Sequence, residues 1–312
     1  MFRHPTRLLA ALLLPLALIA VACGSDSDDA SSSDGGSSET SLPEVKIGIQ
    51  DFPESKILAE VYGQALEEQG FEVSYKELGG FRDIVFSSFE SGDINFTLEY
   101  ASAALEFLNE QAGEADPDIA VVTPLLQTQL EAKGLTAFDA SDAVDSNAYV
   151  VTKETAESKN LSSLADLTPD LKLGGFADCP TNPFCIPGIK DVYGVDLSSN
   201  FVSQDGGELT KSALEGGEID VAVLTTTDPS IAENGWVILS DDKGLINADN
   251  IVPIATDELA TAGGSKLADT VNKVSSTLDT DGLTELNRAF VIDKEDADDV
   301  ASDWLEKNGF KD

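Results

Sequence analysis

Two twelve-residue segments of the chain follow one pattern, and this repeat constrains the fold more than any other feature of the sequence. Residues 89–100 read FESGDINFTLEY and residues 214–225 read LEGGEIDVAVLT. Each segment predicts the end of a helix, a glycine turn, an acidic residue and then a strand. In this alignment Tyr100 and Thr225 occupy the same place, at the end of their strands. The repeat therefore indicates two lobes of similar plan.

The first part of the folded region predicts alternating strands and helices. Residues 45–50 (VKIGIQ) predict a buried strand, and residues 53–70 predict a helix with one apolar face and Gly70 at its end. Residues 71–75 predict the next strand, and a strand–helix–strand unit implies a parallel sheet of the α/β class. Because ligands bind beyond the carboxyl ends of strands in open α/β sheets, we expect Tyr100 and Thr225 on opposite lips of a cleft between the lobes.

Two short strand-like segments mark where the chain crosses between the lobes. They are residues 146–152 (SNAYVVT) and residues 250–256 (NIVPIAT). We therefore assign residues 43–146 and 252–312 to lobe 1 and residues 147–251 to lobe 2. Two crossings form a hinge, and a hinge allows the lobes to close around a ligand.

The start of the chain predicts a membrane-anchored protein. Two arginines precede an apolar run at residues 8–22, which is shorter than the roughly 20 residues of a membrane span and fits a secretory signal. Residues 20–23 (AVAC) resemble the lipobox of bacterial lipoproteins, which implies a signal peptide at 1–22 and a lipid on Cys23. Residues 23–42 are rich in Gly, Ser and Asp and predict a disordered tether. An ordinary cleaved signal with a chance cysteine is the alternative.

The composition excludes several classes of function. The formal net charge is −38, so nucleic acid and anionic lipid headgroups are poor partners. The only histidine is His4, inside the predicted signal, so the mature protein lacks the commonest general base and the commonest transition-metal ligand. We therefore expect no enzyme, no metal and no cofactor, although a catalytic pair of carboxylates remains open in so acidic a chain.

Two cysteines follow Cys23, at Cys179 and Cys185 in the segment DCPTNPFC. Outside the cytoplasm, two cysteines this close predict a disulfide. A pair of metal ligands is the alternative, but two thiolates without histidine supply only half of a zinc site.

Ordered segments along nearly all of residues 45–310 match one family. They are IGIQDFPESKILAEVYGQALEEQGF (47–71), FESGDINFTLEYASAAL (89–105), NAYVVTKETAE (147–157), SLADL (163–167), GIKDVYG (188–194), DGGELTKSALEGGEIDVAVLTTTD (205–228), NIVPIAT (250–256) and WLEKNGF (304–310). In these segments the chain resembles the substrate-binding lipoproteins of glycine betaine/choline-type (osmoprotectant) ABC importers. The resemblance implies a two-lobed, type II periplasmic-binding fold and delivery of a small polar solute to an ABC permease at the outer face of the cytoplasmic membrane, by a monomer.

The resemblance also implies a binding site. Family members hold a quaternary ammonium group among aromatic rings by cation–π attraction, which contributes up to about 2 kcal/mol per desolvated ring. The positions that match the family's site in this sequence are Asp51, Phe52, Tyr100, Asn147, Tyr149 and Asp205. Phe81, in GGFRD, adds a possible ring, and Lys211, Thr225 and Thr226 add polar groups.

Four positions depart from the family pattern. Gln50 and Asn182 stand where members carry a lysine and an arginine, and Lys211 and Thr225 stand where members carry tyrosine. Lys211 would then grip an anionic group or lie on the surface. Simpler roles also remain open elsewhere: Asp51 and Glu54 suit a helix N-terminus, and the threonines at 225–227 suit a helix cap. A surface sensor or adhesive lipoprotein that has lost transport is the alternative function.

Overall fold

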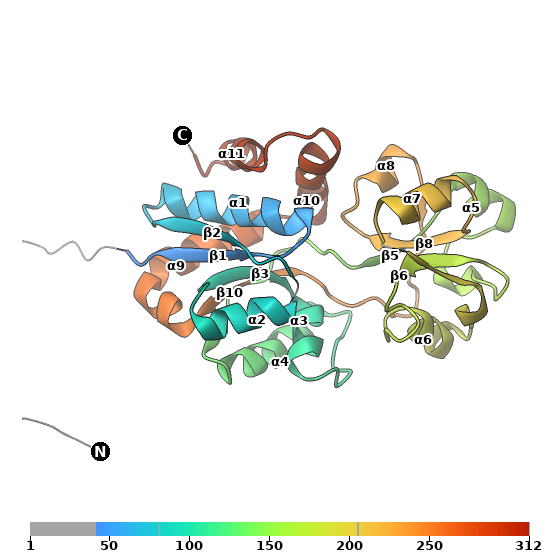
Figure 1. Ribbon diagram of the computed structural model, residues 1–312, viewed down its shortest axis with the longest axis horizontal. Helices are drawn as coiled ribbons and strands as arrows, with labels where there is room; N and C mark the ends of the chain where they lie inside the picture. The colour runs from blue at the N-terminus through green and yellow to red at the C-terminus, as the bar shows by residue number, and fades with distance from the viewer. Residues whose placement is uncertain (1–41, 81, 205, 312) are drawn as a thin grey trace, which may run out of the picture. The chain divides into compact units, whose positions relative to one another are not determined.

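The computed structural model describes residues 42–80, 82–204 and 206–311, which contain two five-stranded mixed sheets (Figure 1). The first sheet has the order β2-β1-β3-β10-β4, and the second has the order β7-β6-β8-β5-β9. The strands of the first sheet are β1 (Val45–Ile49), β2 (Val73–Glu77), β3 (Phe96–Tyr100), β4 (Leu135–Ala137) and β10 (Ile251–Thr256). Those of the second are β5 (Asn147–Val151), β6 (Leu173–Phe176), β7 (Phe201–Gln204), β8 (Val221–Thr225) and β9 (Val237–Ile238). The predicted α/β class is confirmed.

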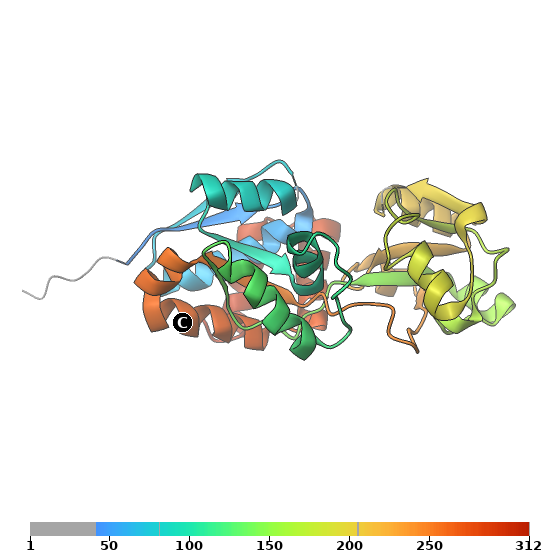
Figure 2. The ribbon, with the colours of Figure 1, turned by 90° about the horizontal axis from the view of Figure 1, so that it is seen from below.

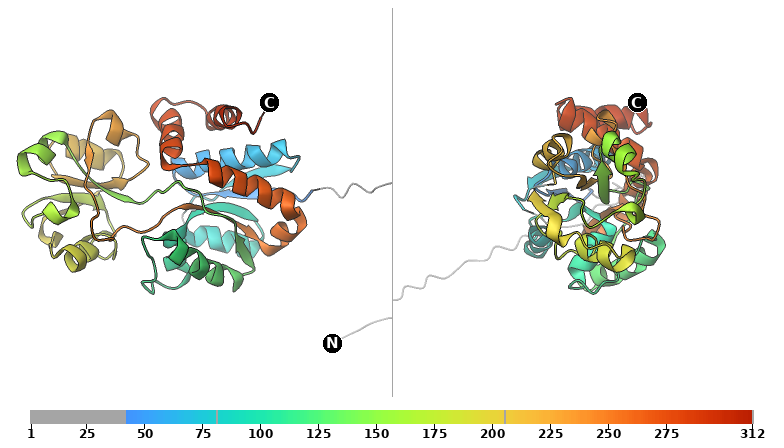
Figure 3. Two further views of the ribbon diagram at one scale, coloured as in Figure 1. Left: turned by 180° about the vertical axis from the view of Figure 1, so that it is seen from behind. Right: turned by 90° about the vertical axis from the view of Figure 1, so that its right-hand side faces the viewer.

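Helices cover both faces of the first sheet. One face packs against α1 (Pro53–Glu68), α9 (Asp257–Thr277), α10 (Thr280–Asn287) and α11 (Ala297–Lys307). The other face packs against α2 (Arg82–Ser91), α3 (Ala101–Leu108) and α4 (Ile119–Glu131). Figures 1 and 3 show α11 beside α1, on the opposite side of the sheet from α4. The core of this lobe therefore has two layers, one on each face of the sheet.

The helix α1 shows how the sequence sets this packing. Pro53 occupies its first turn, where a missing N–H costs no hydrogen bond. Its end is a Schellman turn: Gly70 has a φ of +85° and donates to the Glu67 carbonyl, and Phe71 donates to the Leu66 carbonyl. This turn keeps Phe71 out of the sheet, so the second strand runs over 73–77 and not over the predicted 71–75.

The second sheet carries smaller helices. These are α5 (Lys153–Lys159), α6 (Ile186–Gly188), α7 (Glu208–Glu215) and α8 (Ser230–Glu233), with the single turns η1 (Leu164–Asp166), η2 (Ile189–Tyr193) and η3 (Ser198–Asn200); η4 (Arg288–Ile292) follows α10 in the other lobe. In both sheets a helix, a left-handed glycine turn and a central strand follow one another: α2, Gly92 and β3 in the first, and α7, Gly217 and β8 in the second. The predicted repeat is thus a structural one.

Two chain segments connect the sheets and pair with each other on the way (Figure 2). Val144 and Asn250 form an antiparallel bridge, and the Asp145 N–H donates to the Asp249 carbonyl at 3.0 Å. The strands that follow these segments run antiparallel to their neighbours β8 and β3. The two predicted crossings are therefore present. The exact residues at which the lobes begin and end stay predictions.

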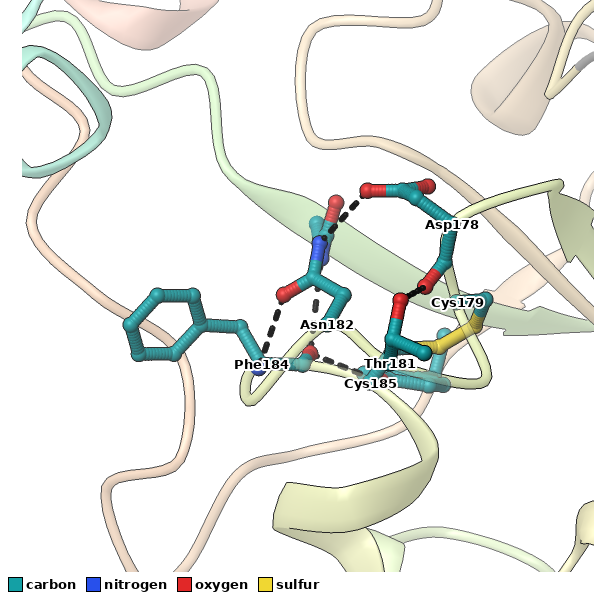
Figure 4. The surroundings of a disulfide bond; sticks show 8 residues. Asp178, Cys179, Thr181, Asn182, Phe184 and Cys185 are labelled. Carbon is teal, nitrogen blue, oxygen red and sulfur yellow. Dashed lines mark hydrogen bonds between the residues drawn. A yellow bond between two sulfur atoms is a disulfide. The ribbon is translucent and has the colours of Figure 1, made fainter. Parts of the chain in front are cut away.

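Cys179 and Cys185 form the predicted disulfide, with their Cα atoms 5.2 Å apart (Figure 4). The Phe184 carbonyl in this loop accepts hydrogen bonds from the Tyr149 hydroxyl (2.9 Å) and from the Asn147 amide (3.4 Å), which fix the loop to β5. Cys23, the predicted signal and the predicted tether up to residue 41 lie outside the described residues. Within the described residues, no helix has the length and apolar character of a membrane span.

Candidate functional site

A cavity of about 610 Å³ lies where the central strands of both sheets end. Tyr100 ends β3, Phe176 ends β6 and Thr225 ends β8, and all three side chains line the cavity. The remaining walls come from the start of α1, the two crossing segments and the loops around α7, β8 and α10. They comprise Phe52, Pro53, Glu54, Arg82, Ala103, Asp145, Asn147, Gly206, Gly207, Lys211, Thr227, Asp228, Pro229, Asp249, Asn287 and Val291.

Three aromatic side chains give the cavity its apolar surface. The rings of Phe52 and Tyr100 are 6.0 Å apart between centroids and tilted by 43°. Phe176 lies against the backbone of Gly206, where an added Cβ would meet the ring at 2.1 Å. Gly206 also has a φ of +70°, so glycine suits this position in conformation and in space. Aromatic rings that line a cavity are suited to bind cations.

Glu54 is the centre of a buried hydrogen-bond network. One carboxylate oxygen accepts from the Tyr100 hydroxyl at 2.6 Å. The other accepts from the Thr227 hydroxyl at 2.6 Å and from the Asn287 side-chain amide. These donors come from β3, from the loop after β8 and from α10, so one carboxylate joins parts of both lobes.

Asp145, in the first crossing segment, lies on the other side of Thr227. Its Oδ1 is 2.7 Å from the Thr227 hydroxyl and accepts the Thr227 backbone N–H at 3.3 Å. Burial raises the pKa of Asp145 well above its usual value, and the negative charge of Glu54 raises it further. Asp145 is thus an acid that the site favours in its neutral form.

A second group of charges surrounds Arg82. Its Nε donates to Glu99 Oε2 at 2.8 Å, and Gln50 donates to the other oxygen of this fully buried carboxylate at 3.3 Å. Asp249 faces the same pair and accepts the Ala103 N–H at 2.8 Å. Burial raises the pKa of Asp249 to about 6, against the opposing effects of the Ala103 hydrogen bond and of Arg82.

Lys211 supplies the second positive charge of the cavity wall. Its Nζ lies 2.6 Å from Glu208 and 3.4 Å from Asp228, and it donates to the Ser230 hydroxyl at 3.2 Å. Both cations that line the cavity are therefore already paired with acids, while four acidic residues (Glu54, Asp145, Asp228 and Asp249) line it. The cavity combines aromatic faces with an excess of acidic groups.

Comparison with known proteins decides the family. Residues 43–307 match the family model for the substrate-binding domain of the ABC-type glycine betaine transport system. The chain belongs to this family.

Individual relatives agree with the assignment. The chain is 24% identical to the glycine betaine-binding protein YehZ of Escherichia coli, over 85% of this chain and 91% of that protein. It is 24% identical to the carnitine transport binding protein OpuCC of Listeria monocytogenes, over 88% of this chain and 89% of that protein. Its structure superposes on that of a glycine betaine/carnitine/choline ABC transporter protein with a TM-score of 0.76 and 26% identity, over 87% of this chain and all of the other. The predicted two-lobed, type II binding-protein fold and the predicted family are confirmed.

Several of the predicted site residues line the cavity. They are Phe52, Tyr100, Asn147, Lys211 and Thr225. Phe81 and Asp205 lie outside the described residues. The other three, Asp51, Tyr149 and Thr226, do not line it, and their contact with a solute stays a prediction.

Each of these three has a structural reason. Tyr149 is fully buried because it lies two residues beyond Asn147 on the same face of β5, inside the core of the lobe. The Thr226 hydroxyl donates to the Val144 carbonyl at 2.8 Å and so holds the first crossing segment. Asp51 is exposed on a neighbouring hollow in front of α1.

The departures from the family pattern lie at different places. Lys211 and Thr225 line the cavity, as described above. Gln50 is buried beside it and bonds to Glu99. Asn182 lies in the disulfide loop, where its amide donates to Asp178 at 3.1 Å and its oxygen accepts the Phe184 N–H at 2.9 Å (Figure 4). Asn182 is therefore occupied in its own loop and does not line the cavity.

Sequence reasoning did not select several lining residues, among them Phe176, Asp145 and Asn287, although Phe176 had a usable signal. It ends a strand, LGGF, and so obeys the same rule that selected Tyr100 and Thr225. Asp145 and Asn287 had no such signal, because long-range contacts place them in the site. Glu54 and Thr227, for which a helix N-terminus and a helix cap were the simpler roles, both line the cavity.

Proposed function

We propose that this protein is an extracytoplasmic lipoprotein that binds a small quaternary ammonium solute, of the glycine betaine or choline type, and delivers it to an ABC permease. Cys23 carries the lipid anchor, and the monomer closes its two lobes over the solute. The solute binds more tightly to the closed form than to the open form, so solute binding favours the closed form that the permease meets. The family assignment and the relatives named for glycine betaine and carnitine support this proposal.

The cavity itself is the observation that carries the proposal. Phe52, Tyr100 and Phe176 line a space of about 610 Å³ whose wall also holds four acidic residues. A quaternary ammonium group cannot donate hydrogen bonds, so it is recognised by aromatic faces and by negative charge. Asn147 and Thr225 offer polar groups to a solute hydroxyl or carboxylate. Family members are solute-binding proteins, and we expect no turnover of the solute.

The first test is a binding screen. The full chain, solubilised in a maltoside detergent, is heated with choline, glycine betaine, carnitine, ectoine, sugars and amino acids, and the hits are titrated by calorimetry. A solute at 100 times its dissociation constant adds about 2.7 kcal/mol to the stability of the folded state. We expect a quaternary ammonium compound to raise the melting temperature, and sugars and amino acids to have no effect.

A pair of variants locates the binding site. Phe52→Leu removes a ring from the cavity and should weaken binding about tenfold, because a desolvated cation–π contact contributes up to about 2 kcal/mol and 1.4 kcal/mol corresponds to tenfold. Phe107→Leu is the matched control, since this exposed ring stacks on Phe86 and does not line the cavity. Failure of all quaternary ammonium compounds to bind, or equal weakening by both variants, would contradict the proposal.

A further inference from the structure

The contacts of the Thr227 hydroxyl require an additional proton. Its Oγ1 is 2.6 Å from Glu54 Oε2 and 2.7 Å from Asp145 Oδ1. A hydroxyl group has a single proton to donate, and a carboxylate oxygen has none. Both short contacts are hydrogen bonds only if one of the two carboxyl groups is protonated.

The neighbours of the two acids indicate which of them holds this proton. Glu54 accepts from three side-chain donors, the Tyr100 hydroxyl, the Asn287 amide and the Thr227 hydroxyl, so both of its oxygens already act as acceptors. Asp145 has two side-chain donors, the hydroxyls of Thr225 and Thr227, and burial next to Glu54 outweighs them and raises its pKa. The proton therefore lies on Asp145, in the chain Asp145 O–H to Thr227 O–H to the Glu54 carboxylate.

The charged groups around this pair do not neutralise it. Among the described residues, neither Glu54 nor Asp145 forms an ion pair. Arg82 is bound to Glu99, and Lys211 is bound to Glu208 and Asp228. Tyr100, Asp228 and Asp249 also lie near the pair, and as acids they can add no positive charge. The proton on Asp145 therefore neutralises one of the two acids, and no ion pair neutralises the other among the described residues.

We propose that the cationic group of the bound solute takes the place of this proton, so that binding of a quaternary ammonium ion releases one proton from Asp145. This inference rests on the proposed function, because it takes the cavity as the solute site. The Asp145 O–H bond breaks, the proton passes to the solvent buffer, and the two carboxylates then face the solute cation; no electrons are transferred. Glu54 and Asp145 are thus specificity-determining residues for a cation.

Proton release makes binding depend on pH in a defined direction. Below the pKa of Asp145 in the free protein, the affinity for a cation should rise as pH rises, because deprotonation of Asp145 is part of the binding reaction. The limit for one released proton is tenfold per pH unit. Above that pKa the acid is already ionised, and the affinity should stop rising.

The first measurement needs no solute. Infrared spectra of the full chain in maltoside at neutral pH should show the carbonyl stretch of a protonated carboxyl group. The band should lose most of its intensity in the Asp145→Asn variant and keep it in Asp93→Asn, a control that changes a surface acid paired with Lys76. A band absent from the unaltered protein, or unaffected by Asp145→Asn, would overturn the shared proton.

The second measurement counts protons. Calorimetric titration with choline at one pH in two buffers of different ionisation enthalpy should give about one proton released per choline bound. Thr227→Ser keeps the bridging hydroxyl and should keep this value. Thr227→Val removes the bridge and should change both the proton count and the pH profile, while the melting temperatures of both variants report folding.

The outcomes separate this inference from the proposed function. Choline binding with no proton released would overturn the inference and leave the solute-binding function intact. Failure of choline and of every other quaternary ammonium compound to bind would contradict the proposed function and, with it, the coupling. Equal proton release in Thr227→Val and Thr227→Ser would overturn the role of the hydroxyl bridge.

Discussion

At the scale of single residues, the acids of the site have different hydrogen-bond partners. Glu99 is held by Arg82 and Gln50, and Glu54 by three hydrogen-bond donors. Asp145 and Asp249 also accept hydrogen bonds, from Thr227 and from the Ala103 N–H, but burial outweighs these bonds and raises the pKa of both. An acid whose pKa is raised on folding stabilises the native state at low pH, and this contribution is lost as pH rises through the raised value.

Asp249 allows this rule to be tested by a single substitution. Its pKa is about 6 in the folded protein, against a usual value of 3.8. Between about pH 4 and pH 6, the unaltered protein should lose about 1.4 kcal/mol of stability per pH unit relative to Asp249→Asn. The variant keeps a side-chain oxygen that can accept the Ala103 N–H.

The measurement is urea unfolding of both proteins at several pH values. Only the difference between them matters, because the other carboxyl groups titrate in both. A difference that stays constant from pH 4 to pH 8 would show that Asp249 titrates normally.

The limits of sequence reasoning are clearest at this scale. Thr227 meets Glu54 across 173 positions of sequence, and Asn287 meets Glu54 across 233. No local pattern encodes such contacts, because they depend on how two lobes fold against each other. Tyr149 shows the opposite case: its place in the Asn-x-Tyr segment matched the family, yet its position within β5 buries it.

At the scale of secondary-structure elements, the sequence is a better guide. The apolar periodicity of α1, the glycine turn that ends it and the repeated helix–turn–strand segments all predicted elements that the structure contains. Since these signals are local, they can be recognised without the rest of the chain. The antiparallel direction of β5 and β10 was not predicted, because it follows from the crossings and not from the residues within each strand.

Two glycine turns, one between β7 and α7 and one between α7 and β8, offer a test at this scale. Gly206 and Gly217 both have a positive φ, of +70° and +69°. An alanine at either position should cost about 1 kcal/mol of stability, since a side chain disfavours this conformation. Gly206→Ala would in addition displace the Phe176 ring, whereas the space around Gly217 is open.

The two substitutions should therefore cause similar backbone strain but differ in their effect on solute binding. We expect Gly206→Ala to weaken quaternary ammonium binding several-fold and Gly217→Ala to leave the affinity unchanged, as measured by calorimetric titration. Equal affinities in the two variants would mean that the position of the Phe176 ring does not matter for the solute.

At the scale of the whole molecule, the family assignment and one cavity support the same proposed function. The repeat in the sequence predicted two similar lobes, and the family model spans both of them, over residues 43–307. The net charge of −38 argued against nucleic acid and anionic lipid as partners, and the acidic cavity gives part of that charge a specific role. Composition alone could not predict the arrangement of the aromatic rings or the shared proton, which together would select the solute.

The most direct test of the central claim is a crystal structure of the protein with choline. We expect choline in the cavity, with its ammonium group within about 6 Å of the ring centroid of Phe52, Tyr100 or Phe176. The ammonium group should also face Glu54 and Asp145. Choline bound only at the outer surface, or a cavity without choline at a saturating concentration, would contradict the account.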